Sequence, residues 1–248
     1  MTNKQRKIVM ISAVFALTFG ITPVANAMHI MEGYLPASYC IGWGVICIPF
    51  LISGFFSIKK TLAANARLLP LAAMAGAFIF VISSLKIPSV TGSCSHMTGT
   101  GLGAILSGPS AVSILGIIVL LFQAILLAHG GLTTLGANTF SMAVAGPFVS
   151  YGIYALCKKA KVNQKVSVFL AATLGDLCTY CVTAIQMALA HHADTTVFGA
   201  MGKFLAVFAP TQLPLAVIEG ILTVLIVTAL ESYAKPELRA IGFIKEVH

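Results

Sequence analysis

Long apolar stretches, separated by short polar or basic segments, dominate the sequence. A helical membrane crossing needs about 20 consecutive apolar residues. Six stretches approach or exceed that length: 35–56, 68–86, 110–128, 136–157, 166–190 and 212–233. No tract alternates apolar and polar positions as a half-buried strand does. The pattern predicts an all-α, polytopic membrane helix bundle.

The first 27 residues have the three parts of a secretory signal peptide. Basic residues come first, an apolar core follows over residues 8–21, and the small residues Ala25 and Ala27 end the segment. Cleavage after Ala27 leaves residues 28–248 as a single transmembrane domain whose free amine is on Met28. The alternative is an uncleaved first helix, although the apolar core is shorter than a full span.

Basic residues predict the orientation of the helices, because Lys and Arg gather in cytoplasmic loops. They form three groups: Lys59, Lys60 and Arg67; Lys158, Lys159, Lys161 and Lys165; and Lys235, Arg239 and Lys245. With the mature N-terminus outside, six crossings would leave the second group outside as well. A seventh crossing is therefore required. It places the C-terminus in the cytoplasm of a bacterial or archaeal cell, with the bundle in its inner membrane.

The missing crossing can only lie in residues 98–109, which are small and apolar and end in Gly108-Pro109. Twelve helical residues span only about 18 Å, so this short, broken helix must be buried in protein. Broken helices often line ligand sites. Its glycines equally suit close helix packing without a site.

Composition excludes several classes of function. Of the 248 residues, 58% are hydrophobic and 9% are charged, which rules out a soluble domain. The net charge of +8 is spread between apolar spans and fits membrane topology better than nucleic acid. The sequence has no GxxxxGK[ST] phosphate loop, so ATP hydrolysis would need a partner chain. It has no HExxH motif either, which argues against an intramembrane metal hydrolase.

The mature N-terminus has the chemistry of a metal chelate. The amine of Met28, the next backbone nitrogen and the imidazole of His29 can bind one ion through fused rings. Nitrogen donors suit late divalent transition metals, and a planar set favours nickel or copper. The predicted topology puts His96 on the same side, where it supplies a fourth nitrogen. The alternative for His29 is a place at the membrane interface near Tyr34.

Other polar residues have weaker claims to function. Asp176 and Glu219 fall inside predicted spans, where ionisable groups mark functional pathways or buried pairs. His191, His192 and Asp194 cluster in an external loop, but neighbouring side chains seldom converge on one ion. We interpret His129 as an interfacial or hydrogen-bonded residue. Six cysteines lie mostly within spans and suit packing rather than disulfides; Cys94, beside His96, is a candidate soft ligand.

Three segments resemble the CbiM family, the cobalt-specific substrate-capturing components of energy-coupling factor transporters. They are MHIMEGYLP at 28–36, SCSHMTGTGLGAILSGP at 93–109 and LGDLCTY at 174–180. The resemblance implies a seven-helix fold and an ion held by the Met28 amine, the backbone nitrogen and imidazole of His29, and the imidazole of His96. It also implies a transmembrane coupling protein, cytoplasmic ATPase subunits and a small two-helix accessory membrane protein as partners.

Two functions follow as expectations. The first is the capture component of an ATP-driven cobalt(II) importer that supplies cobalamin synthesis. An alternative within this function is a component of the same type that is specific for nickel(II). The second is a stand-alone secondary metal carrier, with Asp176 and Glu219 as its ion-coupling relay. An importer component needs an ATPase for uptake. In the carrier, replacing the carboxylates would abolish transport and leave metal binding measurable.

Overall fold

The structure is a computed structural model that describes residues 29–65, 68–88, 94–192 and 195–243. Residues 1–27 with the predicted signal peptide, Met28, Arg67, Asp194 and Lys245 lie outside the described residues, as does the side chain of Cys94. Apart from loops and one pair of two-residue strands, β1 (Ile87–Pro88) and β2 (Cys94–Ser95), the described chain is helical. The predicted all-α bundle is confirmed.

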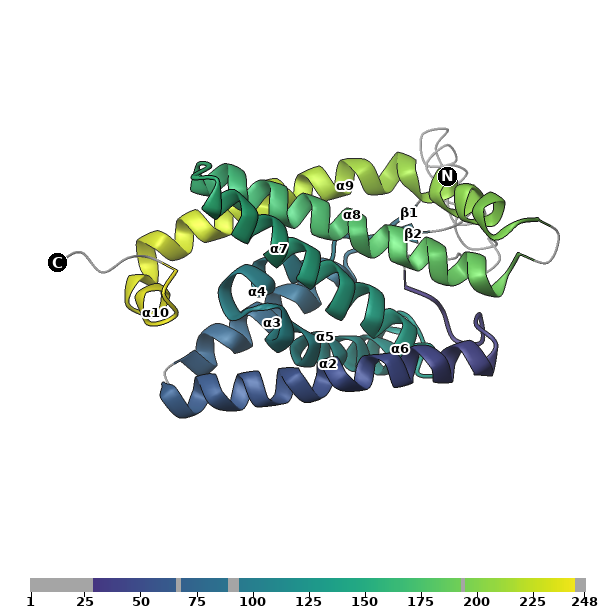
Figure 1. Cartoon of the computed structure of the whole chain (residues 1–248), viewed down its shortest axis with the longest axis horizontal. Helices are drawn as coiled ribbons and strands as arrows, with labels where there is room; N and C mark the ends of the chain where they lie inside the picture. Colours follow the sequence, from purple (N-terminus) through teal and green to yellow (C-terminus); the bar gives the residue numbers. More distant parts are fainter. Residues whose placement is uncertain (1–28, 66–67, 89–93, 193–194, 244–248) are drawn as a thin grey trace, which may run out of the picture.

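In the part of the chain that the structure describes, seven helical elements pack into one bundle, whose longest helices run along the long axis of the molecule (Figure 1). They are α2 (Ala37–Ala64), α3 (Leu69–Ser84), α4 (Thr100–Ser107), α5 (Pro109–Leu127), α6 (Leu135–Asn138) continued by η3 (Thr139–Ala145) and α7 (Gly146–Lys159), α8 (Gln164–Ala190) and α9 (Val197–Tyr233). A short α10 (Lys235–Ala240) ends the described chain. Five of these elements are long and apolar enough to cross a membrane, and α3 is a shorter apolar helix.

The α9 helix is longer than the sequence predicts. The apolar stretch begins at residue 212, whereas α9 begins at Val197 and includes Pro210 and Pro214. Lys203 interrupts the apolar run and the prolines argue against a helix interior, so the hydropathy pattern does not show the first part of this helix. Membrane helices tolerate proline where neighbouring groups satisfy the freed carbonyls. With 37 residues, α9 is about 55 Å long and exceeds the ~30 Å apolar core of a bilayer.

Many polar side chains are buried in the bundle and many large apolar ones are exposed, as expected in a lipid environment. On α5, Gln123 is fully buried while Leu126, less than one turn away, is 65% exposed. On α2, Ile41 and Phe56 are similarly exposed. In water this arrangement would be unfavourable, but hydrocarbon is as apolar as leucine, so exposed apolar side chains cost nothing there. The chain is a multi-pass membrane protein.

The short α4 confirms the predicted broken helix. It has eight residues and begins four residues after His96. Gly101 packs against the α8 backbone so closely that an added Cβ would lie 2.9 Å from the Cα of Ala172. A Cβ added to Gly103 would likewise lie 3.0 Å from the side chain of Val112 of α5. Small residues thus let α4 sit in the middle of the bundle, both packed closely and next to a candidate ligand.

The described members of the three basic groups lie at the end of the bundle opposite β1 and β2 (Figure 1). Lys60 at the end of α2 and Ala240 of α10 line one cavity there. Lys158 of α7 and Gly242 line another. The two ends of the bundle therefore differ in charge, as the predicted topology requires.

Candidate metal-binding site

Three buried histidines meet at the end of the bundle away from the basic groups. His29 comes from the segment before α2, His96 from the loop between β2 and α4, and His129 from the turn after α5. Their exposed fractions are 3%, 0% and 0%. One ligand atom from each ring lies within 4.8 Å of the others. The structure thus brings together the predicted His29 and His96, and adds His129.

The rings of His29 and His96 point at each other. Their atoms Nδ1 and Nε2 lie 2.5 Å apart, although the residues are 67 positions apart in the sequence. His96 Nδ1 lies 2.9 Å from the carbonyl oxygen of Met97 and donates its hydrogen to it. That bond leaves the lone pair of His96 on Nε2, facing His29. A hydrogen-bonded far nitrogen is typical of histidines that bind metals.

A pair of side chains fixes the backbone next to His29. Asn138 accepts a hydrogen bond from Ile30 N at 2.8 Å and donates one to Ile30 O at 2.9 Å. Thr134 donates a second bond to the same carbonyl at 2.6 Å. Asn138 thus pairs with Ile30 as a neighbouring strand would. These hydrogen bonds hold His29 in the bundle and satisfy the buried N–H and carbonyl groups of Ile30.

Two glycines after His129 make room for the N-terminal segment. A Cβ on Gly131 would lie 2.6 Å from the Cα and N atoms of Glu32, so only glycine fits this contact. Gly130 has φ +79°, a conformation that favours glycine, and an added Cβ would lie 3.1 Å from Asn138 Nδ2 and 3.5 Å from the His29 ring. Glu32 also accepts a bond from Thr133 N at 3.2 Å. The turn after α5 therefore forms the surface on which the N-terminal segment packs.

The π-helical segment η3 shapes the other wall of the site. It begins directly after Asn138, and its Ser141 and Met142 line a small cavity with His29 and His96. A π-helical turn in an otherwise α-helical span is rare and is found mostly at functional sites. Asn138, directly before η3, and Ser141 both line this cavity with the two histidines.

Two α9 side chains hold the loop that carries His96. Gln212 Nε2 lies 3.2 Å from His96 O and 2.6 Å from Asp176 Oδ2 of α8. Glu219 accepts bonds from Thr98 N at 2.6 Å and Gly99 N at 3.0 Å. Both predicted intramembrane carboxylates therefore help to hold the His96 loop in place. Glu219 does so by direct hydrogen bonds, and Asp176 does so through Gln212. Among the described residues, neither carboxylate is hydrogen-bonded to a histidine ring.

Burial keeps the imidazoles neutral. The three rings lie on segments between the membrane-crossing helices. Burial lowers the pKa of His29 well below its ordinary value, and the nearby His96 lowers it further. Burial also lowers the pKa of His96, to about 4. At neutral pH both rings are uncharged, and a neutral imidazole is the form that binds a metal.

The interpretation of His129 as an interfacial or hydrogen-bonded residue is wrong. It is fully buried, and neither ring nitrogen has a hydrogen-bond partner in the structure. The topology contained a signal for it, because the predicted crossings place the loop after residue 128 on the same side as His29 and His96. The neighbouring glycines made the residue look like part of an exposed turn.

The remaining candidates lie apart from the three histidines. His191 Nε2 bonds to the carbonyl of Tyr34 at 2.8 Å, and His192 bonds to carbonyls of its own helix, at 3.2 Å for Ala188. Both are exposed. Cys178 and Cys181 are free cysteines of α8. His191 therefore connects the N-terminal segment to the end of α8, and His192 bonds to the last turn of α8.

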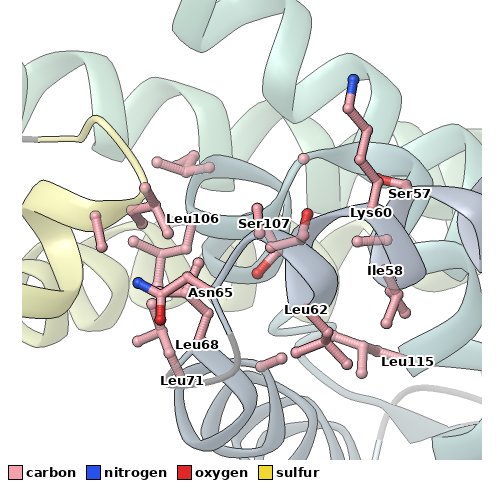
Figure 2. Close-up of a pocket in the computed structure, with 18 of the residues that line it drawn as sticks. Ser57, Ile58, Lys60, Leu62, Asn65, Leu68, Leu71, Leu106, Ser107 and Leu115 are labelled. Atoms are coloured by element: carbon pink, nitrogen blue, oxygen red, sulfur yellow. The ribbon is translucent and has the colours of Figure 1, made fainter.

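A larger cavity of about 560 Å³ lies at the basic end of the bundle, beyond the last turn of α4. Figure 2 shows Leu62, Leu68, Leu71 and Leu106 around it, with the amine of Lys60 directed away from these leucines. The described residues that line it include no histidine, cysteine, aspartate or glutamate. It therefore lacks the donors that a transition metal needs.

Comparison with known proteins places this chain in a known family. The sequence profile of the family described as "cobalt uptake substrate-specific transmembrane region", CbiM, matches residues 29–238. The chain belongs to the CbiM family. It is thus a membrane component of cobalt uptake, and a transport component rather than an enzyme.

Curated relatives agree over nearly the whole chain. A cobalt transport protein CbiM of Lachnoclostridium phytofermentans is 70% identical over 245 residues, which cover 98% of each chain. One of Chlorobium limicola is 60% identical over 89% of this chain and 87% of its own. A crystal structure of a transition metal transporter matches with a TM-score of 0.73 and 30% identity, covering 84% of this chain and 94% of that one.

Proposed function

We propose that this CbiM-family chain is the substrate-capturing component of an ATP-driven energy-coupling factor importer for cobalt(II). The ion is held by the amine of Met28, the backbone nitrogen and Nδ1 of His29, and Nε2 of His96. The observation that supports this set is the 2.5 Å approach of the two ring nitrogens in a buried site. Two nitrogens that face the same point from distant segments are already arranged around an ion.

The N-terminal chelate requires the signal peptide to be removed after Ala27. Only then does Met28 carry a free amine, and only then does a fused-ring chelate form with His29. The deep position of His29 supports this proposal, because Asn138 and Thr134 hold the chain at Ile30 and thereby keep His29, the residue that follows Met28 in the sequence, in the buried site. The mature N-terminus lies outside the cell and the C-terminus in the cytoplasm.

Cobalt(II) is favoured over nickel(II) as the transported ion by the family to which the chain belongs. Four nitrogens alone could hold either ion. The imported cobalt would supply cobalamin synthesis. The coupling protein, the two ATPase subunits and the small two-helix membrane protein are the partners that uptake requires, since this sequence has no phosphate-binding loop.

A stand-alone carrier driven by protons or sodium is the less supported alternative. It needs Asp176 and Glu219 as an ion relay. In the structure Glu219 instead accepts two backbone bonds and a 2.9 Å bond from the Thr98 hydroxyl. A carboxylate with these bonds suits a fixed anchor for a loop better than a group that must exchange ions.

The test is cobalt uptake in cells that produce this chain with or without the ATPase and coupling subunits, together with the metal content of the purified chain. We expect one ion per mature chain, lost in His29→Ala and in His96→Ala, and uptake only with the ATPase present. Undiminished uptake without the ATPase would support the carrier. One bound ion in both alanine variants would refute the site.

A further inference from the structure

The apolar cavity of about 560 Å³ at the basic end of the bundle has no role in the metal site. It lies where the end of α2, the start of α3, the junction of α4 with α5 and the end of α10 come together. Its volume is in the range of small-molecule sites and corresponds to the space of roughly 20 water molecules. The chemistry of its lining therefore decides which molecule fills it.

The inner lining of the cavity is suited to hydrocarbon rather than to water. Much of it comes from leucine and isoleucine side chains of four helices, which include Ile58, Leu71, Leu106 and Leu115 (Figure 2). The junction of α4 and α5 leaves space as well, since a Cβ added to Gly108 would have nothing within 4 Å. Water would find few hydrogen-bond partners among these side chains, whereas an acyl chain is as apolar as leucine.

The polar side of the cavity lies on α2 and carries positive charge only. Ser57, Lys60 and Thr61 of α2 line it, together with Asn65 directly after that helix. The amine of Lys60 is directed away from the leucines, as expected of a lysine whose stem lies along apolar surface while its charge reaches polar surroundings (Figure 2). None of the described residues that line the cavity is Asp or Glu. An anionic group beside Lys60 therefore meets an attractive charge and no acidic side chain of this lining.

The polar side of the cavity lies at the depth of lipid headgroups. With 28 residues, α2 is about 42 Å long and exceeds the ~30 Å apolar core of a bilayer. Two adjacent lysines near its end, Lys59 and Lys60, are exposed and place that end outside the hydrocarbon. Next to the cavity, Phe56 of α2 is 62% exposed and Leu69 of α3 is 56% exposed, so the outer faces of both helices contact lipid. The cavity thus borders the lipid-facing surface where phosphates and acyl chains meet.

We propose that this cavity binds one anionic phospholipid, with its phosphate at Lys60 and an acyl chain among the leucines. Basic pockets between membrane helices are typical sites for anionic headgroups. A helix of a partner protein would also fit apolar walls, but the positive polar side and the adjoining lipid surface favour a lipid. Bound there, the phospholipid connects α2, α3 and α5 beside the short α4, whose eight residues cannot span the bilayer. This inference depends only on insertion into a membrane and not on the identity of the transported ion.

Native mass spectrometry of the purified chain in detergent, titrated with phosphatidylglycerol or with phosphatidylcholine of the same acyl chains, tests the headgroup preference. We expect one phosphatidylglycerol per chain, bound more tightly than phosphatidylcholine. Lys60→Gln should weaken phosphatidylglycerol binding about fivefold, the effect of one lysine at an anionic headgroup, and leave phosphatidylcholine binding unchanged. The matched control Lys203→Gln changes an exposed lysine of α9 that does not line the cavity and should bind as the parent does. Equal affinity of the parent for the two lipids, or parent-like phosphatidylglycerol affinity in Lys60→Gln, would overturn the inference.

Filling the cavity tests the place of the acyl chain. Ala72 of α3 lines the cavity, whereas the next residue, Ala73, is exposed and does not. We expect Ala72→Phe to lose phosphatidylglycerol binding and Ala73→Phe to keep it, and we expect added phosphatidylglycerol to raise the thermal unfolding midpoint of the parent and of Ala73→Phe but not of Ala72→Phe. Undiminished lipid binding in a folded Ala72→Phe would overturn the inference, and loss of the co-purified coupling protein in that variant would then assign the cavity to a protein helix. If Ala72→Phe does not fold, Lys60→Gln decides.

Discussion

Replacing Asn138 with alanine removes the hydrogen bonds that hold the N-terminal segment without touching any proposed ligand. The side chain makes two bonds to the Ile30 backbone, at 2.8 and 2.9 Å. After the change Ile30 O keeps its bond from Thr134, whereas Ile30 N has no other partner in the structure. A buried donor without a partner costs about 1–3 kcal/mol, and the second bond contributes about 1 kcal/mol.

The total of about 2–4 kcal/mol acts on the docking of the N-terminal segment, because Asn138 connects that segment to α6. Each 1.4 kcal/mol changes an equilibrium tenfold. If undocking is readily accessible, cobalt(II) affinity in Asn138→Ala falls by roughly 30- to 700-fold, since only the docked fraction binds. Isothermal titration of cobalt(II) into the purified, metal-free mature chain measures this change directly.

The matched control is Asn163→Ala, which removes an asparagine that caps α8 at the opposite end by accepting from Lys165 N at 2.9 Å. We expect this variant to lose about 1 kcal/mol of stability and no cobalt affinity. Thermal unfolding of both metal-free variants checks that Asn138→Ala still folds. Cobalt affinity in a folded Asn138→Ala within twofold of the parent value would refute the reasoning.

Two further changes test the parts of the site that hold the ligands. Glu219→Gln removes the charge that accepts the bonds from Thr98 and Gly99, and each of these bonds contributes about 1.5–3 kcal/mol. We therefore expect the cobalt affinity measured by titration to fall at least tenfold. Unchanged binding with abolished uptake would support an ion-coupled carrier instead. Gly131→Ala places a Cβ 2.6 Å from the Glu32 backbone and should prevent docking of the N-terminal segment and metal binding. Its control is Gly152→Ala, whose added Cβ has nothing within 4 Å and which should bind one ion per chain as the parent does. Equal metal content in the two variants would contradict the proposed packing of the N-terminal segment on the turn after α5.

The bundle could be predicted from the sequence because hydrophobicity and basic residues encode it directly. Apolar stretches located most of the crossings, and the position of Lys158 demanded the short helix near residues 98–109. The start of α9 could not be found this way. Its first half contains Lys203, which interrupts the apolar run, and Pro210, whose disruptive effect on a helix interior is offset by packing in the folded bundle.

The buried histidine cluster was predicted in part. His29 and His96 could be paired because the predicted topology puts them on one side of the membrane. His129 met the same condition, but its burial depends on the positive φ of Ala128 and on the carbonyl of Gln123, which accepts a bond from His129 N, and both are tertiary features. The roles of Gln212 and Glu219 were likewise hidden, since a polar residue inside a span shows that a partner exists without showing which.

The central claim is that the free amine of Met28 binds the ion. The most direct measurement is the cobalt content of the purified mature chain, with its N-terminus sequenced, compared with a chain that carries one extra alanine before Met28. The extension keeps every side chain and moves the amine away. We expect one ion per chain beginning at Met28 and almost none in the extended chain. Equal cobalt in both, or a purified chain that still begins at Met1, would contradict the account.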